Sequence, residues 1–217
     1  QYLHKPNLYH ARMLSVLYRS WGSRTLDRVT SYRSLSRKEA EERPEYRKKL
    51  DVIASSRLQM AADIVPKECA NDKISALALQ GLMYSNLDQC EKASTIYQKC
   101  IQILQSQYGE IYRCPGLKSL CLLLRYKIGN DEKQYGKIPD VDWYIQQLKK
   151  IEPIYTAQVL SSEQFRYDTY GSSPLHILSC LLLQQGKNRK NESLLKEGAS
   201  YYVENYTYRF TRVTQND

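Results

Sequence analysis

Apolar side chains recur at steps of three and four residues through most of this chain, and this spacing constrains its fold more than any other feature. A clear example is the stripe Leu50, Ile53, Ala54, Leu58, Ala61, Ala62 and Ile64. Residues at such steps lie on one side of an α-helix and give it a buried face. Segments whose polarity alternates residue by residue are nearly absent. The sequence therefore predicts an all-α fold of antiparallel helical hairpins joined by short loops.

Proline, glycine and capping residues divide the pattern into helices. Pro44 is expected in the first turn of a helix that Pro66 ends. Asn71 and Asp72 are placed to cap a helix, and Gly109 to end a later one. The expected helices span residues 8–21, 37–43, 44–64, 74–83, 90–108, 117–128, 141–151, 156–166, 175–185 and 192–202.

The remaining segments are predicted to be breaks between helices. Gly129-Asn130 is expected to end the helix over 117–128, with a polar loop at 131–138. Residues 171–174 supply an N-cap and a first-turn proline for the helix over 175–185, which Gly186 would end before a basic loop at 187–190. Residues 206–211 alternate with period two and are expected to form a short strand or an extended arm.

The chain has three predicted parts. Residues 1–43 form a basic N-terminal arm with an amphipathic helix, residues 44–205 a helical-repeat domain, and residues 206–217 a C-terminal tail. The net charge is +9, and residues 1–38 hold eight basic side chains against the single acid Asp27. An Arg- and Ser-rich, acid-poor front is typical of mitochondrial targeting and predicts that organelle, with the cytosol or nucleus as alternatives. The positive charge favours acidic partners.

Six cysteines are present, and none forms a CxxC pair. Most lie within helical apolar patterns, where free Cys behaves as a small buried apolar residue, so we expect reduced thiols. Three disulfides in a secreted protein are the alternative, and Asn191 and Asn205 each begin a glycosylation tripeptide. No run of 18 apolar residues occurs, so no membrane-spanning helix is predicted.

One hairpin, over residues 74–104, resembles a tetratricopeptide repeat. This repeat places bulky, small and aromatic residues at fixed spacings on two packed helices. Here those positions hold Leu77, Gly81, Tyr84, Ala93, Tyr97 and Cys100. Gly81 and Ala93 are expected where the helices cross closely, with Tyr84 and Tyr97 filling the space beside them.

A second, looser unit follows 42 residues later, where Leu82-x-Tyr84 recurs as Leu124-x-Tyr126. That offset is similar to the longer repeats of the kinesin-light-chain type. The resemblance implies a short tetratricopeptide-like α-solenoid whose concave face receives an extended peptide or a neighbouring subunit. Residues 1–65 take no part in it.

No arrangement of residues typical of catalysis is visible. The three histidines are His4 and His10 in the basic front and His176 on an apolar helix, where a hydrogen-bonded structural role is expected. The spacing of Cys114 and Cys121 completes no tetrahedral metal site. Nucleotide-binding and hydrolase motifs are missing. The sequence therefore predicts a protein that is not an enzyme and that needs no cofactor or metal.

The predicted function is a protein-interaction scaffold, an assembly factor or an accessory subunit of a larger, mitochondrial complex, with acidic proteins or subunits of a membrane complex as partners. Helical phase suggests a contact surface made of Lys73, Gln80, Tyr84, Lys92, Arg125 and Lys127. The alternative is a helical-repeat RNA-binding protein, since Lys and Arg stand next to Tyr in segments such as 46–49 and 206–209.

Overall fold

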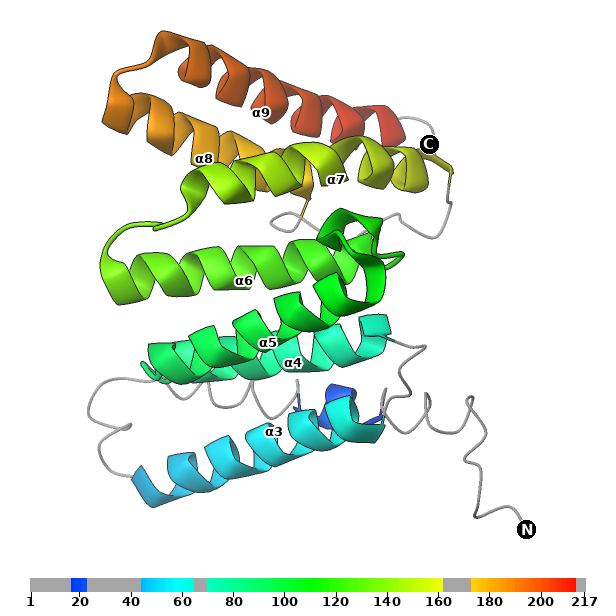
Figure 1. The fold of residues 1–217 in the computed structure, drawn as a ribbon, viewed down its shortest axis with the longest axis vertical. Helices are drawn as coiled ribbons and strands as arrows, with labels where there is room; N and C mark the ends of the chain where they lie inside the picture. The colour runs from blue at the N-terminus through cyan, green and yellow to red at the C-terminus, as the bar shows by residue number, and fades with distance from the viewer. Residues whose placement is uncertain (1–16, 23–43, 65–69, 162–172, 214–217) are drawn as a thin grey trace. The chain divides into compact units, whose positions relative to one another are not determined.

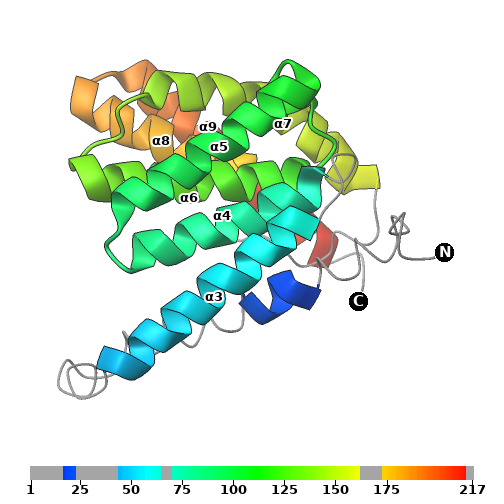
Figure 2. The same ribbon diagram turned by 60° about the horizontal axis from the view of Figure 1, so that its bottom comes forward.

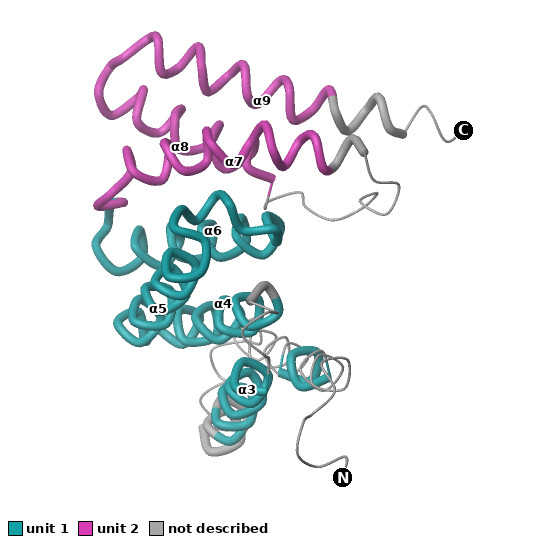
Figure 3. The backbone as a smooth tube through the Cα atoms, turned by 45° about the vertical axis from the view of Figure 1, so that its right-hand side comes forward, with its two compact units in different colours: residues 1–137 teal, residues 138–217 magenta. Residues whose placement is uncertain are grey.

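A computed structural model describes residues 17–22, 44–64, 70–161 and 173–213. Throughout these residues the regular structure is helical, and they contain no strand, which confirms the all-α prediction (Figure 1). None of the helices in these ranges is long and apolar enough to cross a membrane. The chain divides into two compact units, residues 1–137 and 138–217 (Figure 3). The predicted helix over 8–21 is described only from residue 17, where it is helical, and the predicted helix over 37–43 lies outside the described residues.

Unit 1 is built around one central helix. Its elements are α3 (Pro44–Ile64), α4 (Ala70–Asn86), α5 (Cys90–Tyr108), the 3-10 turn η2 (Ile111–Arg113) and α6 (Leu117–Tyr135). Helix α4 contacts α3, α5 and α6, and α5 also contacts α6 (Figure 2). A short helix over 17–22 also belongs to this unit, where Gly22 contacts Leu58 of α3. Because α4 packs on three neighbours, most of its apolar side chains are buried.

Unit 2 consists of three helices, α7 (Val141–Ser161), α8 (Pro174–Arg189) and α9 (Glu192–Val213). Helix α8 contacts both α7 and α9. Its buried residues include Leu175, Leu178 and Leu182, which recur at the predicted helical steps. Ion pairs between Arg189 and Asp142 and between Lys149 and Glu197 join helices of this unit at its surface.

Several helix boundaries are those expected from the sequence. Pro44 begins α3, and α5 spans Cys90–Tyr108 as predicted. Gly109 follows α5 with φ +72°, a left-handed conformation that glycine adopts without strain. Pro174 is the first residue of α8, and Ser173 precedes it in an extended conformation but makes no capping hydrogen bond through its side chain.

Most other helices are longer than predicted. Asn71 and Asp72 lie inside α4 rather than capping it, Pro153 lies inside α7, and α6 continues through Gly129-Asn130 to Tyr135. The expected loop at 131–138 is therefore wrong for residues 131–135. The cause is packing, because Asn130 is fully buried and hydrogen-bonded to α5. Local stop signals are weaker than such tertiary contacts.

The end of the chain also differs from expectation. Gly186 does not end α8, which continues to Arg189, and Lys190 then takes a left-handed conformation. Asn191 accepts a hydrogen bond from the backbone N–H of Leu194 and so caps α9. The predicted strand or extended arm at 206–211 is wrong, because α9 continues to Val213. Tyr206 packs on Tyr202 one turn away, with ring centroids 4.9 Å apart, an arrangement that a helix provides.

Candidate functional site

The hairpin α4–α5 buries nearly all of the residues that carry the tetratricopeptide resemblance. Leu77, Ala93, Tyr97 and Cys100 are each at most 1% exposed. A Cβ atom added to Gly81 would lie 2.4 Å from Cε1 of Tyr97, so the ring of Tyr97 fills the space that a larger residue would need. Gly81 therefore lies where the two helices cross closely, as predicted.

Burial changes the acidity of two side chains in this crossing. Removal from water raises the pKa of Cys100 to about 12 and the pKa of Tyr97 well above its ordinary range, with Tyr126 adding to the latter shift. Both groups remain neutral at physiological pH. They are packing residues without nucleophilic character.

Tyr84 and Gln80 contact α3 rather than forming an open surface. The hydroxyl groups of Tyr84 and Ser55 are hydrogen-bonded at 2.7 Å. Gln80 is only 4% exposed, and its Nε2 donates to the carbonyl oxygen of Ser55 at 3.3 Å and to its hydroxyl at 3.2 Å. Lys92 lies over the ring of Tyr84, 5.6 Å from its centroid, and donates to Gln89. These candidate contact residues thus help to hold α3, α4 and α5 together.

The other predicted contact residues differ in exposure. Lys73 is half-buried, and Arg125 is exposed on α6. Lys127 forms an ion pair with Asp131 one turn away, at 2.8 Å, with 14% and 5% of the side chains exposed. Lys127 is therefore engaged within α6. Arg125 and Lys92 are the two candidates with exposed side chains, and Lys92 is engaged with Tyr84 and Gln89.

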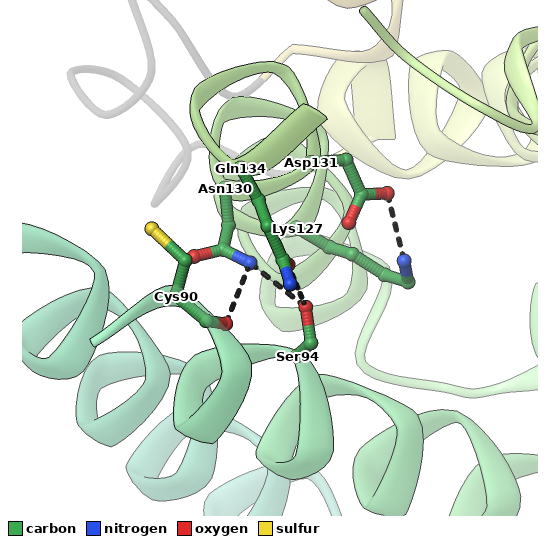
Figure 4. Close-up of polar contacts among 6 residues, drawn as sticks. All are labelled: Cys90, Ser94, Lys127, Asn130, Asp131 and Gln134. Carbon is green, nitrogen blue, oxygen red and sulfur yellow. Dashed lines mark hydrogen bonds and ion pairs between the residues drawn. The ribbon is translucent and has the colours of Figure 1, made fainter. Parts of the chain in front are cut away.

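A cluster of polar side chains ties α5 to α6, and sequence reasoning missed it (Figure 4). Nδ2 of Asn130 donates to the carbonyl oxygen of Cys90 at 3.1 Å and to Oγ of Ser94 at 2.9 Å. Ser94 in turn donates to Oε1 of Gln134 at 2.9 Å. Asn130 lies seven residues after the buried Leu123 and so falls on the apolar stripe of α6. A polar residue on such a stripe signals a buried hydrogen-bonded tie.

Helices α4 and α6 run parallel, with contacts at both ends. Near their N-termini, the hydroxyl groups of Ser75 and Ser119 are hydrogen-bonded at 2.6 Å. Near their C-termini, Nζ of Lys133 donates to the carbonyl oxygen of Ser85 and forms an ion pair with Asp88 at 2.7 Å. Helix α5 connects them in the opposite direction. These contacts join residues 44 and 48 positions apart, close to the offset of 42 noted in the sequence.

Partly exposed residues on these parallel helices form what we term the α4–α6 face. The α4 residues of this face recur at helical steps, on the side of α4 opposite the one that packs on α5. The α6 residues of the face lie beside them on the parallel helix. The face consists of Ser75, Leu79, Leu82 and Asn86 on α4, and of Lys118, Leu122, Arg125 and Gly129 on α6. Three leucines of the face are therefore only partly buried, and two of them, Leu79 and Leu82, also pack against the buried Ala54 of α3 and Met83 of α4.

Groups that could perform chemistry are sparse in the described residues. Within them, no three or more His, Cys, Asp or Glu side chains are grouped to hold a metal ion. Cys90, Cys100, Cys114, Cys121 and Cys180 form no disulfide, and Cys69 lies outside the described residues. The pKa values of Cys114 and Cys121 are raised by burial, so these thiols too stay protonated at neutral pH.

Comparison with protein-family models, with curated proteins and with solved structures finds no match to this chain. The class of protein therefore rests on the fold itself, which is an arrangement of packed α-helical hairpins.

Proposed function

We propose that this chain is a non-catalytic protein-interaction module, related in architecture to tetratricopeptide repeats, that holds a segment of another protein against the α4–α6 face. Its role would be that of a scaffold, an assembly factor or an accessory subunit of a larger complex. The Arg- and Ser-rich front of the chain supports a mitochondrial setting for that complex.

The observation that carries this proposal is the composition of the α4–α6 face. Leu79, Leu82 and Leu122 remain partly exposed on two helices that are fixed to each other at both ends. A rigid apolar strip of this kind loses little conformational entropy when a partner covers it. Lys118 and Arg125 beside the leucines favour a partner segment that carries both apolar and acidic residues.

The polar interior of unit 1 fits a structural role better than a catalytic one. Asn130, Ser94 and Gln134 hydrogen-bond across α5 and α6, and Gln80 bonds to α3. The hydrogen bonds of these groups join one helix to the next. Side chains used in this way support the geometry of a binding face, because they fix how neighbouring helices pack.

Nucleic-acid binding has less support from the same residues. Base stacking needs an aromatic ring with an accessible face. Tyr97 and Tyr144 are buried, and the ring of Tyr84 is covered by Lys92 while its hydroxyl bonds to Ser55. Tyr84, the one tyrosine of the predicted contact surface, is thus engaged in packing, whereas Tyr135 and Tyr202 are exposed elsewhere. RNA binding remains the alternative against which the proposal is tested.

Reversing one charge on the face tests the proposal. We expect the tagged chain to retain a stoichiometric protein partner after nuclease treatment, and Arg125→Glu to lose that partner by opposing an acidic segment. Lys99→Glu makes the same charge change at an exposed position of α5 away from the face and serves as the matched control. Native purification followed by mass spectrometry, with circular dichroism to check folding, measures all three proteins.

Three outcomes would contradict the proposal. The first is nucleic acid that co-purifies and is released steeply by salt, which would favour the RNA-binding alternative. The second is equal loss of the partner from both variants, which would indicate a general effect of charge. The third is a partner that Arg125→Glu retains in full.

A further inference from the structure

Unit 2 carries a thiol and an imidazole side by side, a pair that the proposed function does not use. His176 and Cys180 lie one turn apart on α8, and Nε2 of His176 is 3.7 Å from Sγ of Cys180. Cys180 is exposed, and His176 is half-buried beside it. In the tautomer that leaves Nε2 unprotonated, the imidazole accepts a hydrogen bond from the thiol.

The pair is better suited to thiol chemistry than to holding a metal. Zinc in a protein takes three or four protein ligands. No group of three or more His, Cys, Asp or Glu with metal-site geometry occurs in the described residues. Two ligands one turn apart on one helix do not complete such a site. A thiol beside an imidazole, in contrast, has what nucleophilic sulfur chemistry needs, which is a base within hydrogen-bonding distance.

Cys180 also differs from the other described cysteines in access to reagents. Cys100, Cys114 and Cys121 are buried, and Cys90 is half-buried in the first turn of α5. Reagents dissolved in water reach buried thiols only when the structure opens. Modification of the folded chain is therefore directed to Cys180 rather than to the three buried thiols, and Cys90 is less accessible than Cys180.

We propose that Cys180 is a site of S-thiolation by low-molecular-weight disulfides and that His176 is the base that assists it. The thiol transfers its proton to Nε2 of His176 as Sγ attacks one sulfur of the small disulfide. The disulfide bond breaks, and its electron pair leaves with the second sulfur. A mixed disulfide forms at Cys180, and the released thiolate takes the proton from the imidazolium. One thiol is consumed and one is released, so the exchange is balanced.

The modification would place a charged tripeptide on the outer side of α8 when the probe is glutathione disulfide. Because α8 packs on both α7 and α9, the adduct adds bulk and charge to the surface of the central helix of unit 2. The chain would thereby report an oxidising shift in its compartment. This inference does not depend on the proposed interaction through the α4–α6 face, which lies in unit 1.

The test uses the full chain with its thiols reduced and all glutathione removed. Glutathione disulfide is then added as the probe. Peptide mapping by mass spectrometry gives the rate of adduct formation at each cysteine. We expect Cys180 to react about tenfold faster than Cys90 because of its exposure and its neighbouring base. Cys180→Ser should remove the adduct at residue 180. Cys90→Ser should leave the rate of adduct formation at Cys180 unchanged.

The role of His176 is tested separately. We expect His176→Ala to slow the modification of Cys180 about tenfold, which is less than the effect of a general base in an enclosed active site. Added imidazole should restore part of the lost rate in this variant and leave the rate of the wild type nearly unchanged, a result that a purely structural role would not give. His176→Gln, which retains a polar side chain, provides a second variant if the alanine change lowers stability.

The proposal would be overturned by modification of Cys90 at a rate equal to that of Cys180. Unchanged reactivity of Cys180 in both His176 variants, with folding intact by circular dichroism, would equally exclude the assisting base. The assisting base would also be excluded if added imidazole accelerated the modification of Cys180 in the wild type as strongly as in His176→Ala.

Discussion

Two glycines of unit 1 differ in how closely other side chains approach them. Gly81 faces the buried ring of Tyr97, whereas Gly129 lies on an exposed part of α6. Apart from its chain neighbours and its own helix backbone, no heavy atom lies within 4 Å of the place where the Cβ of residue 129 would be. The first glycine is required by packing between helices. The second is tolerated in a helix interior where alanine would be favoured.

We expect Gly81→Ala to lower the free energy of unfolding by about 1–3 kcal/mol, because Tyr97 is fully buried and has little room to move away. Gly129→Ala should raise it by up to about 1 kcal/mol through helix propensity alone. Urea unfolding followed by far-UV circular dichroism compares the two variants with the wild type. Equal stability of Gly81→Ala and the wild type would show that the crossing is looser than the structure indicates.

Burial of Cys100 gives a pH dependence that can be measured. Its folded-state pKa is raised from 9.0 to about 12, so between these values the unfolded chain loses a proton that the folded chain keeps. The folded state then binds more protons, and stability falls as pH rises. The loss begins near pH 9 and approaches about 1.4 kcal/mol per pH unit.

Comparison with Cys100→Ala isolates this effect from other groups that titrate at high pH. The difference in unfolding free energy between wild type and variant should be constant below pH 8. It should decline above about pH 9 at the slope given above. A difference that stays constant to pH 10.5, measured by urea unfolding at each pH, would contradict a buried, protonated thiol.

At the scale of elements, the close approach of two helices determines how they pair more than local stop signals do. Gly186 of α8 faces Leu195 of α9, and Gly198 of α9 faces Leu183 of α8. An added Cβ would lie 2.7 Å from Cγ of Leu195 in the first case and 3.0 Å from the backbone N of Leu183 in the second. Each glycine therefore faces a leucine of the other helix, and together the two glycines set the distance between α8 and α9.

We expect Gly186→Ala and Gly198→Ala each to destabilise the chain by about 1–3 kcal/mol. The double variant should lose less than the sum, because helices moved apart by one methyl group already have room for the second. A double-mutant cycle in urea measures this coupling, with Gly129→Ala as the control glycine of a helix surface. Strict additivity would show that the two sites do not share one interface.

At the scale of the whole molecule, the chain consists of two compact units that meet in sequence between Lys137 and Ile138. Gly136 ends α6 in a left-handed conformation, with φ +67°, and Gly136, Lys137 and Pro139 are exposed. Exposed connections of this kind are preferred sites of proteolysis because their backbone enters a protease without disrupting a core.

Limited digestion with trypsin should therefore cleave after Lys137 and release a fragment that begins at Ile138. Sites within α5, such as Lys92 and Lys99, should resist, because cleavage there requires the helix to open. Mass spectrometry of the early digest identifies the fragments, and Lys137→Gln should abolish this one. Cleavage within α5 before Lys137 would contradict the division into two units.

The sequence by itself determined the fold class, the position of α5 and the burial of Leu77, Ala93, Tyr97 and Cys100, because apolar spacing records which side of each helix is removed from water. Gly109 also ended its helix as predicted, since its exposed, left-handed conformation depends only on its neighbours in the chain.

Only the tertiary structure decided where several helices end and which polar residues lie inside. Gly129, Asn130, Pro153 and Gly186 are local stop signals, yet α6, α7 and α8 continue through them. Asn130 bonds to α5 and Gly186 receives Leu195 of α9, and both partners are distant in sequence. Inside a helix, local propensity costs about 1 kcal/mol for glycine and about 3 kcal/mol for proline, and tertiary packing outweighs these costs. The same long-range contacts turned Gln80 from a predicted contact residue into a tie between helices. They also decided for Tyr84, which the sequence had placed in both the packing set and the contact set, in favour of a bond to α3.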